Sequence, residues 1–313
     1  MKKLIVSPSP HDENFLSATR IMLKVITALL PAWFAGLYIF GARCISLTAV
    51  CIGSCILFEY LCRLLMGRNN TVGDLSAVVT GMLLAMNLPV TLPYWMAVTG
   101  SFIAIAIVKQ LFGGLGQNFA NPAITARIVL MISFPASMTH WIKPFEFDYD
   151  AVSSATPLAL EKAGEGLPTY AELFFGKTGG CLGETCALAL LAGGIYLMVT
   201  KIISPAAPLA FIGSLFIFSW LANEDPIYQI LSGGVFLGAF FMATDYATTP
   251  ITAKGKVVFG LGCGILTFVI RRFGAYPEGV SFSILIMNVL TPYIEEITRN
   301  KAFGAKEVRK DEG

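Results

Sequence analysis

Length, composition and charge restrict the classes of protein to which this chain can belong. The chain has 313 residues, of which 55% are hydrophobic and only 13% are charged. Because a soluble domain carries roughly 25% charged residues, lipid is the simplest replacement for the missing polar surface. A net charge of +2 without a basic, aromatic-rich stripe argues against a nucleic-acid partner. Two histidines, His11 and His140, are too few for a histidine-rich site, and we expect no metal.

Apolar runs of the length of a membrane helix recur along the whole chain. We expect about ten spans, at residues 21–41, 44–65, 74–90, 94–112, 118–135, 181–200, 207–222, 228–244, 256–271 and 280–297. Several are short and interrupted by Gly or Pro, and irregular backbone at membrane depth is tolerated only where protein or a cavity covers it. The fold class predicted is therefore an all-α polytopic membrane protein with an internal site. The first apolar run follows a polar arm without the form of a cleavable signal peptide, so we expect the first span to be retained.

The distribution of positive charge predicts the orientation of these spans. Both termini are expected on the cytoplasmic side, and residues 136–180 on the outer side. The basic residues that this orientation places inside are Lys2, Lys3, Arg63, Arg68, Lys109, Lys201, Lys254, Lys256, Arg299, Lys301, Lys306, Arg309 and Lys310. Arg271 and Arg272 are exceptions, because they fall near an outer end.

Four of the seven cysteines recur at helical spacing in the second span. Cys44, Cys51, Cys55 and Cys62 fall on nearly one face of a helix. Thiolates ligate iron–sulfur clusters, but thiols spread along about five helical turns cannot converge on one ion. Small residues at a helix–helix seam are the preferred interpretation.

Two segments of the first half have weak counterparts in the second. Leu75-Ser76 followed by Gly81 resembles Leu231-Ser232 followed by Gly238, and the run from Lys109 resembles the run from Arg271. With five spans in each half, the second copy would be inverted in the membrane, and such repeats place their site at the repeat interface. We therefore expect a first repeat at 1–135, an external loop at 136–180, a second repeat at 181–297 and a cytoplasmic tail at 298–313.

A glycine-rich turn enters the fifth span as Gly113-Gly-Leu-Gly-Gln-Asn-Phe-Ala-Asn-Pro-Ala123. Glycines let a backbone approach a ligand closely, and a helix N-terminus presents free N–H groups. Asn118 and Asn121 would share a helix face and offer amides to a planar heteroaromatic ring. The alternative is an N-cap with a tight helix crossing.

The polar segment Asp150-Ala-Val-Ser-Ser-Ala-Thr156 precedes Pro157 in the external loop. By local rules Thr156 is an N-cap and Pro157 occupies the first helical position. The other interpretation is that one of these hydroxyls is a covalent attachment point. A nucleophile–base pair is not evident, since His140 is the nearest candidate base along the chain.

Three carboxylates lie at predicted span ends in the second half. Asp245 in the Ala-Thr-Asp turn and Glu278 in Tyr276-Pro-Glu-Gly279 are candidates for an ion or proton route, because carboxylates at such positions are often functional. Capping of nearby helix ends is the alternative for both. Glu184 opens a span beside glycines, where close packing explains it and a flavin contact is the second interpretation.

At these residues the chain resembles the RnfD/NqrB family of membrane redox subunits. Asp150, Ser153, Ser154, Ala155 and Thr156 fit the family's Asp-x-x-Ser/Thr-Ser/Gly-Ala-Thr motif. The glycine–asparagine turn, the Ala-Thr-Asp turn and Tyr-Pro-Glu-Gly extend the resemblance to nearly the full length. The resemblance implies FMN joined to Thr156 by a phosphoester, with the other motif residues recognised by a flavin transferase. It also implies a fold similar to urea and ammonium transporters.

The implied function is an electron-carrying subunit of an Rnf complex, which couples electron transfer from ferredoxin to NAD⁺ with Na⁺ or H⁺ export across a prokaryotic cytoplasmic membrane. The partners implied are the subunits RnfA, RnfB, RnfC, RnfE and RnfG. A non-covalent riboflavin is expected in the bundle, and Asn118 and Asn121 are its candidate site. Three alternatives stay open: an NqrB-like subunit passing electrons to quinone, a secondary transporter without a chromophore, and an inactive scaffold.

Overall fold

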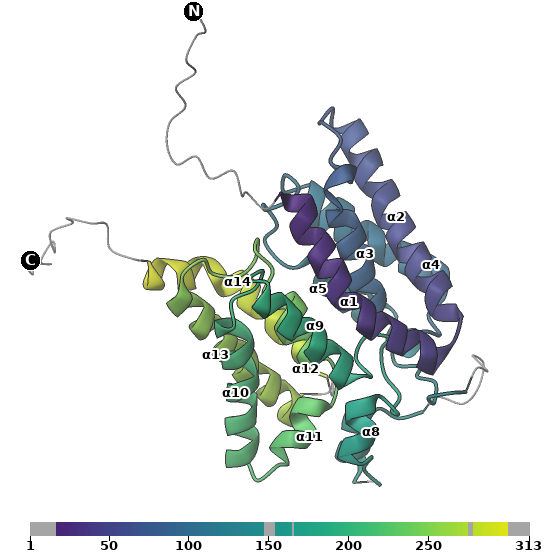
Figure 1. Ribbon diagram of the computed structural model, residues 1–313, viewed down its shortest axis with the longest axis vertical. Helices are drawn as coiled ribbons and strands as arrows, with labels where there is room; N and C mark the ends of the chain where they lie inside the picture. The colour runs from purple at the N-terminus through teal and green to yellow at the C-terminus, as the bar shows by residue number, and fades with distance from the viewer. Residues whose placement is uncertain (1–16, 147–153, 165, 275–277, 300–313) are drawn as a thin grey trace, which may run out of the picture.

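Two groups of helices are joined by a polar linking segment in the computed structural model, which describes residues 17–146, 154–164, 166–274 and 278–299. The first group lies on one side of Figure 1 (purple to blue) and the second on the other (green to yellow). All regular structure in these ranges is helical. The prediction of an all-α membrane protein is confirmed at this level.

The first group contains α1 (Ala18–Phe40), α2 (Arg43–Leu65), the short 3₁₀ turn η1 (Val72–Asp74), α3 (Ser76–Met86), α4 (Tyr94–Phe102), η2 (Ile103–Gln110) and α5 (Pro122–Ser133). The segment η2 continues α4 as a π-helix, a wide form that is frequent at functional sites. Helix α2 packs against both α3 and the α4–η2 rod.

The linking segment contains α6 (Pro135–Met138), α7 (Pro157–Ala163) and α8 (Tyr170–Phe175). The second group contains α9 (Ala187–Val199), α10 (Ala206–Leu221), α11 (Pro226–Leu231), α12 (Val235–Leu237), the π-helical η3 (Gly238–Met242), α13 (Ala253–Phe273) and α14 (Val280–Thr298). Here α10 packs against α13 and α11.

Within the described part of the chain, four helices are long and apolar enough to cross a membrane by length and composition: α1, α2, α13 and α14. The other apolar helices are shorter. The expected span at 228–244 is not one helix, because it breaks at the Ser232-Gly-Gly turn between α11 and α12. The two groups meet where α1 packs against α9 and α5 packs against α14.

The cysteine stripe of α2 forms part of a close helix contact. Cys44, Cys51 and Cys55 are buried, Cys62 is half-buried, and all seven cysteines are free thiols. A Cβ placed on Gly81 of α3 would lie 2.7 Å from Ile52 Cα of α2, so the two backbones nearly touch there. Small residues at this seam permit that approach.

Candidate functional site

Thr156 lies at the start of α7, in the linking segment between the two groups. Its Oγ1 accepts a hydrogen bond from Ala159 N at 3.3 Å, and Pro157 is the first helical residue. The expected N-cap is therefore confirmed. Thr156 is only 7% exposed, whereas Ala155 is exposed. Of the other motif residues, Asp150 and Ser153 lie outside the described residues.

A cavity lies directly beside Thr156 at this end of the molecule, with about 350 Å³ of empty space that is partly open to solvent. It is bounded by the start of α7, the 178–185 loop, the turn before α12 and the residue preceding Gly279. Its lining residues are Thr156, Pro157, Leu158, Leu173, Thr178, Gly179, Gly180, Glu184, Thr185, Leu231, Gly233 and Glu278. Thus Thr156 shares a cavity with two carboxylates that are distant from it in the sequence.

Two glycines of the cavity wall pack tightly against neighbouring side chains. A Cβ on Gly179 would lie 2.6 Å from Ser154 Oγ, and Gly233 has a φ of +65° with its Cβ position 3.0 Å from a Leu158 methyl. The Oγ1 of Thr185 is buried without a hydrogen-bond partner among the described residues. A side chain at either glycine would collide with these neighbours, and Thr185 offers a ligand one available hydroxyl.

A buried guanidinium joins the two carboxylates of the cavity. Arg127 NH1 donates to Glu184 Oε1 at 2.5 Å, and NH2 donates to Glu278 Oε2. The same guanidinium reaches Asn87 Oδ1 at 2.7 Å and Cys181 Sγ at 3.4 Å. Arg127 belongs to α5, whereas Glu184 precedes α9 and Glu278 precedes α14. The cluster therefore links the first helix group to the starts of two helices of the second.

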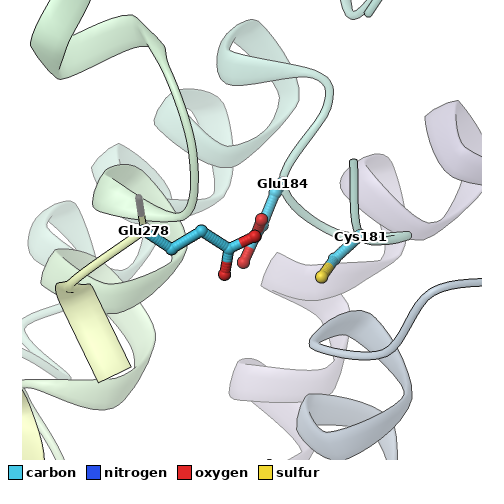
Figure 2. Close-up of side chains that lie close together, drawn as sticks. All are labelled: Cys181, Glu184 and Glu278. Carbon is cyan, nitrogen blue, oxygen red and sulfur yellow. The ribbon is translucent and has the colours of Figure 1, made fainter. Parts of the chain in front are cut away.

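Cys181, Glu184 and Glu278 point toward one another, with their possible ligand atoms within 4.8 Å (Figure 2). Such a set has the chemistry of a metal site. Arg127, however, already supplies the positive charge and binds all three side chains. We therefore read the group as an ion-pair cluster.

Burial also affects the pKa of one carboxylate of this cluster, Glu278. It raises the pKa of Glu278, which precedes α14, while Arg127 opposes the shift and the neighbouring Glu184 adds to it. The side chain of Glu278 keeps 11% exposure, compared with 4% for Glu184. Glu278 is thus the carboxylate that solvent reaches more easily.

Arg271 of α13 is a second buried cation next to the cavity. It donates to Gln229 Oε1 at 3.0 Å, to the Ser232 carbonyl at 3.0 Å and to the Glu278 carbonyl at 3.2 Å. Its neighbour Arg272 pairs with Glu224 at 2.5 Å on the surface. Arg271 and Arg272, the two basic residues that the expected orientation places near an outer end, therefore both have local partners.

The opposite end of the molecule holds a second, mainly apolar cavity with a few polar groups in its wall. It is lined by residues of both groups, among them Lys109, Asn118, Asn121 and Asp245, within about 750 Å³ of empty space that includes open solvent. Asn118 Oδ1 is buried there without a partner among the described residues. This places the two candidate flavin asparagines and the candidate ion-route aspartate on one cavity, and Glu278 on the other.

Asn118 and Asn121 do not share a helix face as expected, because α5 begins only at Pro122. Asn121 is the N-cap, and its Oδ1 accepts from Ala123 N at 3.1 Å and Ile124 N at 3.3 Å. Proline at the first helical position fixes the helix start downstream of both asparagines. The capping interpretation of Asn121 is therefore confirmed.

Asp245 also has a local structural role. It follows η3, is half-buried, and accepts hydrogen bonds from Thr248 Oγ1 at 3.3 Å and Ala247 N at 3.5 Å. These bonds match the capping alternative. Its place on the cavity with Lys109 leaves the ion-route prediction untested.

Sequence reasoning missed Arg127, Glu59 and the role of Lys109. Lys109 Nζ lies 2.7 Å from Glu59 Oε2 and 2.6 Å from Ser76 Oγ, with both charged side chains almost fully buried. A charged residue inside an apolar span is a functional candidate by default, and that signal was present at Glu59 and Arg127. Their partners were not visible, because they come from other helices.

Comparison of the sequence with known proteins shows the family of this chain. A family model described as NQR2, RnfD, RnfE matches residues 5–304. The chain belongs to this family. It is 50% identical over 313 residues, 98% of both chains, to an Acetobacterium woodii protein whose name makes it the D subunit of a Na⁺-translocating ferredoxin:NAD⁺ oxidoreductase complex.

Two further relatives carry similar names. A Clostridium ljungdahlii protein, named as the D subunit of a proton-translocating ferredoxin:NAD⁺ oxidoreductase complex, is 40% identical over 319 residues, 96% of both chains. A Stutzerimonas stutzeri protein, named as the D subunit of an ion-translocating oxidoreductase complex, is 39% identical over 327 residues, 92% of both chains. All three names give the D subunit of an ion-translocating oxidoreductase complex, and the first names Na⁺ where the second names a proton.

Proposed function

We propose that the chain is the D subunit of a membrane complex that oxidises ferredoxin, reduces NAD⁺ and translocates an ion. In this proposal it relays electrons through FMN joined to Thr156 by a phosphoester. The family membership and the full-length similarity to the D subunits of such complexes support the assignment. The observation that carries the flavin part is the position of the Thr156 hydroxyl at a cavity bordered by buried carboxylates.

The residues around this cavity fit a flavin. Thr156 offers the hydroxyl for the phosphoester, Gly179, Gly180 and Gly233 line the cavity, and Thr185 Oγ1 is a free hydrogen-bonding group among the described residues. FMN would supply the ability to accept and release electrons. The chain supplies its position and the charge around it.

The covalent link predicts a fluorescent band at this chain's mass after full denaturation, when the chain is co-expressed with a flavin transferase. Thr156→Ala should abolish the band, since the hydroxyl is the acceptor. Thr169→Ala is the matched control, because Thr169 is also an N-cap in the linking segment and its loss should leave the fluorescence unchanged. A dark wild-type band beside an active control substrate would refute the flavin assignment.

We further propose that the two helix groups are inverted repeats contributing ten membrane-crossing elements to a prokaryotic cytoplasmic membrane. In both groups a cation from the fourth element donates to a serine of the third: Lys109 Nζ to the hydroxyl of Ser76, which begins α3, and Arg271 to the backbone carbonyl of Ser232, which follows α11. This recurrence supports the repeat.

The topology can be tested with single cysteines placed near either terminus and in the 166–169 loop. An impermeant maleimide added from outside is expected to label only the cysteine in the loop.

Riboflavin without a covalent link is proposed for the cavity lined by Asn118, Asn121 and Lys109. The unpartnered Asn118 Oδ1 supports a ligand that donates a hydrogen bond there. In a Thr156→Ala complex, acid precipitation should still release riboflavin, and adding Asn118→Ala should reduce the amount. Equal release from both complexes would place riboflavin elsewhere.

The transported ion is a separate question, because one relative's name gives Na⁺ and another's gives a proton. Ferredoxin-driven uptake of radioactive sodium by proteoliposomes, with and without a protonophore, distinguishes the two.

The family description also includes NQR2, so a quinone-reducing role is the second candidate. Quinone reduction without NAD⁺ reduction would favour it.

A further inference from the structure

The buried charges around the Thr156 cavity balance one another. Arg127 and Arg271 are the cations, and Glu184 and Glu278 are the anions, with all four at most 8% exposed. Buried charge is tolerated when it is paired and hydrogen-bonded. Added negative charge, whether the phosphodiester of a flavin on Thr156 or an arriving electron, would make this set net negative in a poorly solvated place.

The electron-carrying role proposed above would add such a charge, because an electron arriving at a flavin on Thr156 enters the same cavity. The two arginines are held in place and keep their charge, since an arginine does not lose its proton in proteins. A carboxylate can instead gain a proton. The compensating group should therefore be a carboxylate that faces the cavity, touches the cluster and can be reached by water.

Glu278 meets these conditions better than the other carboxylates near the cavity. Glu184 and Glu278 both bind Arg127, but the side chain of Glu184 is 4% exposed and that of Glu278 is 11% exposed. Glu161 of α7 is half-buried outside the cavity lining, and its Oε2 accepts from Gln229 Nε2 at 2.9 Å, whereas Glu224 is paired with Arg272. Cys181 is fully buried and donates to the Asn87 carbonyl at 3.2 Å.

We propose that Glu278 is a proton-binding site that balances the charge of the electron when a flavin on Thr156 is reduced. One electron enters the flavin, one proton moves from outer water to a carboxylate oxygen of Glu278, and the net charge of the cavity stays constant. Arg127 holds this carboxylate next to Glu184, whose negative charge favours the protonated form of its neighbour. The proton serves local charge balance at the Thr156 end, and no transfer across the membrane is required of it.

The test is a reduced-minus-oxidised infrared difference spectrum of the whole complex, with dithionite as the electron donor. We expect a protonated-carboxyl band on reduction that shifts in heavy water. The band should be lost in Glu278→Gln and in Thr156→Ala, and retained in Glu161→Gln, the control at a half-buried glutamate of α7 that does not line the cavity. Glu184→Gln should weaken the band, because the like charge that favours protonation is removed.

Each result has a defined meaning. A flavin that is reduced with no carboxyl band, or with a band that persists in Glu278→Gln, overturns this proposal and leaves the flavin assignment intact. A dark wild-type chain in the denaturing gel overturns both. Reduction that depends on Na⁺ and shows no carboxyl band means that a metal cation supplies the compensation instead.

A merely structural role for Glu278 is separated by two further measurements. Glutamine preserves the size of the side chain and can still accept from Arg127, so Glu278→Gln should retain the wild-type melting temperature within a few degrees. If that variant does not assemble, Glu278→Asp keeps a carboxyl group in a changed position, and its band should move in frequency without disappearing. An unmoved band would assign it to another residue.

Discussion

The two helix groups hold a buried cation at comparable places and satisfy it with different chemistry. In the first group, Lys109 binds the carboxylate of Glu59 at 2.7 Å. In the second, Arg271 binds carbonyl oxygens and an amide oxygen, all of them neutral. An ammonium is a compact and strongly hydrated charge, whereas a guanidinium spreads its charge over five donors. Neutral acceptors therefore suffice for Arg271, while Lys109 requires a counter-charge.

The largest expected effect comes from removing one member of the charged pair in the first group. Lys109→Met should lower the free energy of unfolding by about 3–5 kcal/mol, because it leaves the carboxylate of Glu59 buried and unpaired. Thermal unfolding of the purified chain in detergent measures this loss. The double variant Lys109→Met with Glu59→Leu should recover most of it, and a double variant as unstable as the single one would contradict the explanation.

Arg271→Lys tests whether the shape of the guanidinium matters in the second group. Lysine keeps the charge but loses the planar fork, so at least one of the carbonyl contacts at Gln229, Ser232 and Glu278 should be lost. The expected cost is about 1.5–3 kcal/mol, the range for one hydrogen bond to a charged group. The same melting experiment measures it. A variant as stable as wild type would show that the charge, and not the fork, matters at this position.

The smallest effect is expected at the neighbouring surface pair. The side chain of Arg272 is 40% exposed and that of Glu224 is 23% exposed, so water and salt screen their attraction. Arg272→Ala should change stability by less than about 1 kcal/mol, and raising the salt concentration should reduce the difference further. A loss comparable to that of Arg271→Lys would mean that this pair is effectively buried in the assembled protein.

Local features of the fold were predictable where short-range rules decide the structure. The N-caps at Thr156 and Asn121 follow from a capping side chain before proline, and the buried cysteine face of α2 follows from helical periodicity. The helix that breaks at Ser232-Gly-Gly was predicted as one continuous span at 228–244. The residues on both sides of the turn are apolar, so a search for apolar runs does not detect it. Likewise, the sequence did not reveal that α5 starts after both asparagines of the glycine-rich turn.

The sequence by itself determined that this chain is an all-helical membrane protein. Its low share of charged residues requires lipid in place of water, and the length of its apolar runs matches helices that cross a bilayer. It also identified the residues that carry the family motif. Tertiary structure decided which charges meet: Arg127 is separated by 57 residues from Glu184 and by 151 from Glu278. Partner choice over such separations depends on how the helices pack, because only packing brings the charges within hydrogen-bonding distance and removes the water that would otherwise solvate them.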